Sequence, residues 1–141
     1  MRYYSLNENS NTATFSEAVI RGLAPDRGLY FPKNIQRLSD DFLKHLAEKS
    51  PVEIGVELMR QFVGDSIPKA RLEQIVADTL CFDFPVVSLG DNLATLELFH
   101  GPTMAFKDVG ARFLARCMSQ VSDRKYTILV ATSGDTGSAV A

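Results

Sequence analysis

The sequence lacks any apolar run approaching the roughly eighteen residues that a membrane-spanning helix needs. Its opening stretch, MRYYSLNENS, also lacks the apolar core of a secretory signal peptide. Both absences argue against a membrane protein or a secreted protein. We therefore expect a cytosolic protein.

An excess of charge of one sign is lacking as well. The 15 Lys and Arg residues are balanced by 17 Asp and Glu residues, which gives a net charge of -2. This balance argues against a nucleic-acid partner. The 45% hydrophobic and 23% charged residues are typical of a soluble globular domain. A length of 141 residues suits one domain, or one domain with part of another.

Cysteine is scarce, and the two that occur are far apart. Neither Cys81 nor Cys117 belongs to a CxxC motif or lies near a plausible set of metal ligands. We expect both to be small buried apolar residues in a reducing compartment, and we expect no metal site. Internal repeats and low-complexity segments are also absent.

The first part of the chain begins with a short strand and a helix. The tyrosine-rich stretch Arg2–Leu6 predicts the strand. Thr14 and Glu17 form a capping-box pattern that starts a helix, and Gly22 fits its end. The following loop, APDRGLYFP, has the Pro, Asp and Gly of a compact ordered loop.

Three short helices are expected from Ser39 onward. The clearest begins at Ser50–Glu53, where a serine N-cap, a proline at the first helical position and a glutamate three residues after the cap agree. Gly64 ends this helix, and Pro68 opens another. The chain up to residue 85 is therefore expected to be mostly helical.

The pattern changes in the last third of the chain. Residues 94–99 and 126–131 read as strands, residues 104–121 read as a helix, and a second helix starts close to the end. This order predicts an α/β fold with a right-handed parallel βαβ unit. We divide the chain into a mostly helical domain, 1–85, and the beginning of an α/β domain, 86–141.

A sheet of two strands with one helix cut short is not a complete fold. We therefore expect this chain to be the front part of a longer protein. The strand expected at 126–131 would present an exposed edge, through which a dimer could form.

Lys107 stands near the start of the helix that follows the first of these strands. With Thr103 as N-cap, it would lie about one turn into the helix. One interpretation makes it a solvated surface lysine whose charge Asp108 offsets. The other makes it a reactive amine, because ligands of open α/β sheets bind at the carboxyl ends of strands. A neutral lysine costs roughly 4–5 kcal/mol at pH 7. A helix terminus supplies only about 0.3–1 kcal/mol of this, so a reactive amine needs burial and an aldehyde partner.

The second corner, Thr132–Gly137, follows the second predicted strand and lies at the same sheet edge. Its two glycines allow backbone amides to approach an anion, and Ser133 and Thr136 add hydroxyl groups. The turn is neither a GxxxxGK[ST] loop nor a GxGxxG loop. Together the two corners predict a site for an amine-linked ligand and an anion.

The motifs LELFHGPTMAFKDVGARF and TILVATSGDTGSAVA, with YYS and DRGLYFP before them, closely resemble the threonine synthases over essentially the whole chain. The resemblance implies the tryptophan-synthase-β-like (fold type II) architecture and the cofactor pyridoxal 5'-phosphate. It implies that Lys107 forms an aldimine with this cofactor and transfers protons. Cofactor-binding candidates are Lys107, Ser133, Gly134, Asp135, Thr136 and Gly137. Substrate-binding candidates are Ser133, Thr136 and His100, although His100 fits a packing role equally well.

The resemblance also implies the reaction, in which O-phospho-L-homoserine and water give L-threonine and phosphate. The enzyme would be a carbon-oxygen lyase of threonine biosynthesis. Two alternatives remain: a related phospho-lyase that acts on another phosphorylated amino alcohol, and a non-catalytic anion-binding α/β module. In the resembled family the loop that holds the cofactor phosphate lies further along the chain. We therefore expect residues 1–141 alone to be inactive and to hold the cofactor poorly.

Overall fold

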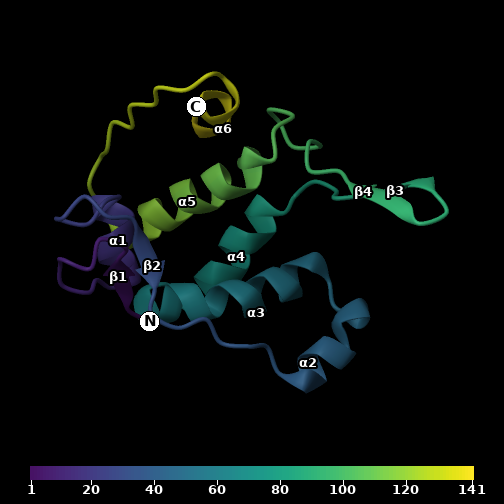
Figure 1. The fold of residues 1–141 in the computed structure, drawn as a ribbon, viewed down its shortest axis with the longest axis horizontal. Helices are drawn as coiled ribbons and strands as arrows, with labels where there is room; N and C mark the ends of the chain where they lie inside the picture. The colour runs from purple at the N-terminus through teal and green to yellow at the C-terminus, as the bar shows by residue number, and fades with distance from the viewer.

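The computed structural model describes residues 1–141 as a set of helices with two separate two-stranded antiparallel sheets (Figure 1). In chain order the elements are β1 (Tyr3–Ser5), α1 (Phe15–Arg21), β2 (Tyr30–Pro32), α2 (Asp40–Lys44), a 3-10 turn (Leu46–Glu48), α3 (Pro51–Val63), a 3-10 turn (Gly64–Ser66), α4 (Lys69–Thr79), β3 (Val86–Gly90), β4 (Leu93–Leu96), α5 (Lys107–Val121) and α6 (Asp135–Val140). None of these helices has both the length and the apolar content that a bilayer crossing requires.

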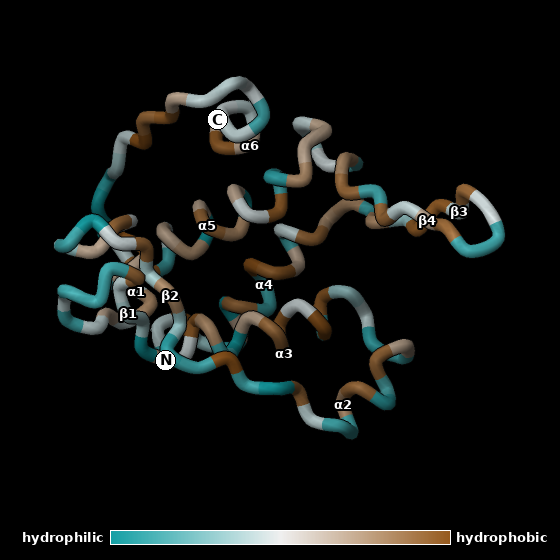
Figure 2. Tube along the Cα trace, viewed as in Figure 1, coloured by the Kyte–Doolittle hydropathy of each residue, from teal (hydrophilic) through white to brown (hydrophobic).

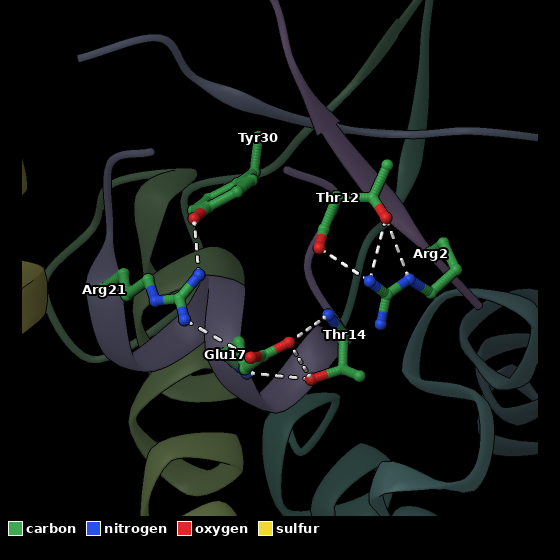
Figure 3. Close-up of polar contacts among 6 residues, drawn as sticks. All are labelled: Arg2, Thr12, Thr14, Glu17, Arg21 and Tyr30. Carbon is green, nitrogen blue, oxygen red and sulfur yellow. Dashed lines mark hydrogen bonds and ion pairs between the residues drawn. The ribbon is translucent and has the colours of Figure 1, made fainter. Parts of the chain in front are cut away.

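Two capping boxes start helices α1 and α3, as the sequence predicts. The Glu17 amide donates to the Thr14 hydroxyl over 3.2 Å, and the Glu17 carboxylate accepts from the Thr14 amide over 2.8 Å. The pair formed by Ser50 and Glu53 repeats both distances. Figure 3 shows the α1 box continuing to Arg21, which bonds both Glu17 and the Tyr30 hydroxyl. These local contacts explain why the helix starts were predictable.

Strand β1 pairs antiparallel with β2 and ties the N-terminus to the helices. Ser5 lies opposite Tyr30 in this pairing, and Tyr3 also bridges to Ala13. The Tyr3 hydroxyl donates to the Phe62 carbonyl at the end of α3 over 2.9 Å. Burial raises the pKa of Tyr3 to about 12. The strand predicted at 2–6 is thus confirmed, and its Tyr3 side chain connects it to the end of α3.

The predicted compact loop after α1 is held by Asp26. Its carboxylate accepts from the Ser5 hydroxyl over 2.6 Å and from the amides of Gly28 and Asn9 over 3.0 and 2.9 Å. A side chain at Gly28 would collide with the Ser5 hydroxyl oxygen. The loop therefore packs so closely on β1 that only glycine fits there.

One hydrophobic core joins the N-terminal helices to α5. Its buried members come from β1, α1, α3, α4, the turn before α4, and α5: Tyr3, Phe15, Val56, Val63, Ile67, Leu72, Ile75, Val76 and Cys117. Cys117 is completely buried, as predicted, whereas Cys81 is exposed at the end of α4, so its predicted burial is wrong. Helix α5 thus packs with the N-terminal helices, and the division at residue 85 stays a prediction.

The predicted parallel sheet does not form among these residues. Strand β4 pairs antiparallel with β3 in a hairpin, with Val86 opposite Leu96, and the hairpin projects from the helices in Figure 1. Residues 126–131 form no strand, and Leu129 is 89% exposed. A strand needs a neighbour for its hydrogen bonds, and β4 takes the nearest one in sequence. The edge on which the expected dimer depended is therefore missing.

Helices α3 and α4 approach each other closely at Gly55. A Cβ atom there would lie 2.7 Å from Val76 Cγ1 and 3.1 Å from Leu80 Cδ1. Overpacking costs about 1–3 kcal/mol, and the better helix propensity of alanine returns only about 1 kcal/mol. We expect Gly55→Ala to lower the free energy of unfolding of the 141-residue chain by about 1 kcal/mol in urea denaturation.

Gly110, inside α5, provides the matched control. No heavy atom lies within 4 Å of the position that its Cβ would take. Gly110→Ala should therefore raise the free energy of unfolding by about 0.5–1 kcal/mol. An equal gain in Gly55→Ala would contradict the close packing of α3 on α4.

The capping carboxylates predict a loss of stability in acid. Hydrogen bonds from the Thr14 and Ser50 backbone amides hold the pKa values of Glu17 and Glu53 below the ordinary 4.5. Both carboxylates therefore stabilise the fold above about pH 4.5, and this contribution disappears as pH falls through the lowered values. Urea midpoints should decline below that pH. In the double variant Glu17→Gln/Glu53→Gln the decline should be shallower, because glutamine can still cap and does not titrate.

An equally steep decline in the double variant would assign the acid sensitivity to other groups. The Asp26 carboxyl is one such group, since the Ser5 hydroxyl holds its pKa below 3.8.

Candidate active site

Lys107 is the first residue of α5, so the helix begins later than predicted. Its side chain is half-buried, and its Nζ lies 5.4 Å from the centre of the Phe106 ring. No carboxylate of residues 1–141 forms an ion pair with it. The lysine is thus a primary amine in contact with an aromatic face at a helix start.

Asp108 holds the corner in front of this helix. The side chain is 1% exposed, and its carboxylate accepts from the Thr103 amide over 3.0 Å and from the Thr103 hydroxyl over 2.7 Å. Asp108 and Lys107 therefore form no direct ion pair. The Asp108 carboxylate faces backward along the chain, into the corner.

Thr103 does not act as the predicted N-cap. Its hydroxyl donates to Asp108 instead of accepting from a helix amide, and the residue at the cap position is Phe106. Between them Met104 has a φ of 56°, a left-handed conformation that is unusual for a methionine. Because residue 104 is not helical, α5 begins only at Lys107.

Helix α5 is also fixed along its length by α4. The Arg112 guanidinium donates to the Asp78 carbonyl over 2.9 Å and to Cys81 Sγ over 3.2 Å. Further along, Arg71 Nε donates to Gln120 Oε1 over 3.0 Å. The polar side of α5 therefore binds a neighbouring helix, and the position of Lys107 depends on both helices.

The glycine turn before α6 is organised by Thr132. The Thr132 hydroxyl accepts from the amides of Gly134 and Gly137 over 2.9 and 3.1 Å. Gly134 has a φ of 143°, which requires glycine, and nothing lies within 4 Å of its missing Cβ. Two of the backbone donors expected for an anion are thus occupied. The hydroxyls of Ser133 and Thr136 form no hydrogen bond within the chain.

His100 pairs with Glu97. Its Nε2 lies 2.6 Å from Glu97 Oε2, and its ring stacks on Phe99 at 4.8 Å between centroids. The Glu97 carboxylate fixes the orientation of the imidazole ring. The other ring nitrogen, Nδ1, has no partner in the chain, so His100 can still offer this atom to a ligand.

The structure brings part of this predicted site together. Helix α6 packs against α5, so the glycine turn belongs to the same packed unit as the helix of Lys107 (Figure 1). No hydrogen bond connects the Lys107 side chain with the turn or with His100. The two corners are thus associated through their helices.

Sequence reasoning missed the supporting roles of Thr132, Glu97 and Asp108. Thr132 carries a recognisable signal, because a threonine two residues before a glycine often closes such a turn with its hydroxyl. Glu97 and His100 are three residues apart but not in a helix, so spacing alone did not pair them. The contact of Asp108 with Thr103 was missed because it depends on the turn at Met104.

The reactivity of the two thiols tests whether α5 is packed against the core. Cys117 is fully buried, and burial raises its pKa to about 12, whereas Cys81 is exposed. A thiolate is the reactive form, so we expect Ellman's reagent to label Cys81 quickly in the native protein. Cys117 should react only after denaturation. Native Cys81→Ser should then show no fast reaction, and rapid labelling of Cys117 in that variant would contradict the packing described here.

Comparison with known proteins identifies the relatives of this chain. A sequence model of the family described as threonine synthase N terminus matches residues 2–80. The threonine synthase of Escherichia coli (strain K12) is 39% identical over 100% of this chain, which covers 33% of that protein.

Solved structures of threonine synthases also match this chain. The crystal structure of threonine synthase from Escherichia coli matches with a TM-score of 0.92 at 38% identity, over 99% of this chain and 33% of that one. The PLP-bound threonine synthase from Brucella melitensis matches with a TM-score of 0.81 at 38% identity, over 86% of this chain and 27% of that one. This chain thus spans about a third of the length of the curated relatives that it matches, and its α/β fold matches their N-terminal part. It belongs to the threonine synthase N-terminus family.

Proposed function

We propose that this chain is the N-terminal part of a threonine synthase. In this proposal the complete protein converts O-phospho-L-homoserine and water to L-threonine and phosphate. The observation that carries the proposal is a half-buried lysine without an ion-pair partner, at the start of a helix, in a chain of this family. A cytosolic location and the architecture of fold-type-II pyridoxal-phosphate enzymes are parts of the same proposal.

The residues present fit pyridoxal 5'-phosphate. Lys107 offers a primary amine, which is the group that the aldehyde of this cofactor requires. Nothing in the chain lies within 4 Å of the position that a Cβ atom of Gly134 would take, so this side of the turn is open to a ligand. When bound, the cofactor supplies an electron sink for negative charge at the substrate carbons. Lys107 would hold it, and Ser133–Gly137 would border it.

The remaining roles follow from what each side chain can donate. When its amine is free of the cofactor, the Lys107 Nζ can take a proton from a substrate carbon and return it. The hydroxyls of Ser133 and Thr136 are available for the substrate carboxylate, and they are better candidates than the amides of Gly134 and Gly137, which Thr132 occupies. His100, oriented by Glu97, can contact the phosphate group of the substrate through Nδ1.

The test uses the full-length protein that carries this chain. Wild type should release phosphate from O-phosphohomoserine and form threonine. Lys107→Ala should lower kcat at least about a thousandfold, since loss of a covalent catalytic group has effects of this size. Lys107→Arg should fail equally, because it keeps the charge and loses the amine. The exposed lysine Lys125 provides the control, and Lys125→Ala should keep wild-type turnover.

Three results would contradict the proposal. Normal turnover in Lys107→Ala would remove the lysine from the mechanism. Phosphate release without threonine would favour a different lyase of phosphorylated amino alcohols. Absence of any turnover, together with binding of simple phosphate, would favour an anion-binding module.

A further inference from the structure

We propose that Asp108 is the positioning residue for Lys107, and that it acts through Thr103. This inference rests on the proposed function, because it assumes that the Lys107 amine is the reacting group. Asp108 touches neither substrate nor cofactor in this proposal. It sets the direction in which the neighbouring lysine leaves the helix.

The burial of Asp108 calls for an explanation. A carboxylate that is 1% exposed has lost almost all of its contact with water. No cation of the chain forms an ion pair with it. Burying an ionisable group without a cation is costly, and an apolar residue of similar size would fill the space at lower cost. The carboxylate must therefore supply something that an apolar side chain cannot.

That contribution is a closed ring of hydrogen bonds around the lysine corner. The two Asp108 oxygens bind the Thr103 amide and hydroxyl over 3.0 and 2.7 Å. The Asp108 amide in turn donates to the Ala105 carbonyl over 3.0 Å. Both ends of the segment 103–108 are thus joined, and Lys107 lies inside the joined segment. Its backbone cannot rotate unless these bonds break.

The same ring stabilises an unfavourable backbone turn. Met104, inside the segment, has a φ of 56°. A non-glycine residue in this region is held there only when its surroundings determine it. The bonds from Asp108 to Thr103 span this residue and keep the turn closed. The start of α5 at Lys107 therefore depends on the Asp108 carboxylate.

Gly101 supports the carboxylate from the other side. A Cβ atom at this position would overlap Asp108 Oδ2 and lie 3.0 Å from Asp108 Cβ and Cγ. The Gly101 residue is itself buried. Glycine thus leaves the space into which the carboxylate fits, and Gly101→Ala should push the ring open without removing any of its hydrogen-bonding groups.

The experiment compares cofactor uptake with stability in the full-length protein. Apoenzyme is mixed with pyridoxal 5'-phosphate, and the rate at which the visible absorption of bound cofactor appears is measured alongside kcat and KM. We expect Asp108→Asn, Thr103→Ala and Gly101→Ala to slow uptake and lower kcat about 10- to 100-fold, with KM changed much less. A displacement of about 1 Å at a reacting group has effects of this size. Thr103→Ser keeps both bonds and should match wild type.

Two controls separate positioning from general destabilisation. Gly55→Ala, between α3 and α4, should lower the unfolding midpoint and leave the uptake rate unchanged. Asp123→Asn replaces an exposed carboxylate after α5 and should change neither. Circular dichroism defines a temperature at which every variant compared is folded. If Asp108→Asn does not fold, Thr103→Ala and Thr103→Ser still give the comparison.

Wild-type uptake and kcat in folded Asp108→Asn and Thr103→Ala would overturn the inference, as would slow uptake in Gly55→Ala in proportion to its stability. If wild type and Lys107→Ala take up the cofactor equally, the proposed function fails and this inference fails with it. If they differ while the Asp108 and Thr103 variants match wild type, only this inference fails.

Discussion

The packing of α5 on the N-terminal helices is the constraint on which the candidate site depends. Cys117, completely buried, joins this helix to the core of α1, α3 and α4. On the polar side of α5, Arg112 and Gln120 form hydrogen bonds with α4. Because Lys107 is the first residue of this helix, its reactive atom is positioned by a core that lies several turns away. The N-terminal region therefore takes part in building the site.

Two kinds of contact position α5. Apolar burial determines where the helix axis lies, since it is strong but not directional. The ring formed by Thr103 and Asp108 determines how the helix begins, since hydrogen bonds require defined angles. A lysine that must meet a ligand atom needs both. The glycine turn at α6 follows the same rule, with helix packing for its position and the Thr132 hydroxyl for its shape.

What could be predicted from sequence was local. The boxes at Thr14–Glu17 and Ser50–Glu53 involve residues three apart, so their chemistry is visible in the sequence. The pairing of β3 with β4 depends on which strands are available, and the sequence pattern predicted a parallel neighbour that these residues do not provide. Lys107 and the turn at 133–137 were found through motif resemblance. The roles of Thr132, Glu97 and Asp108 were missed because their contacts form only in non-helical turns, whose shape residue spacing does not reveal.

Hydrophobic residues occur both in the N-terminal helices and in the β3–β4 hairpin (Figure 2). The buried hydrophobic residues lie mainly in β1, α1, α3, α4 and α5, whereas those of the β3–β4 hairpin and of residues 126–131 face water, with Val86 70% and Leu129 89% exposed. Such hydrocarbon surface attracts other hydrocarbon surface. In concentrated solution residues 1–141 alone should therefore bind fluorescent hydrophobic dyes, adsorb to vessel walls and engage chaperones that recognise extended apolar segments. The exposed apolar surface of the hairpin and of residues 126–131 thus governs how residues 1–141 associate with other surfaces, while the buried core of β1, α1, α3, α4 and α5 supplies thermodynamic stability.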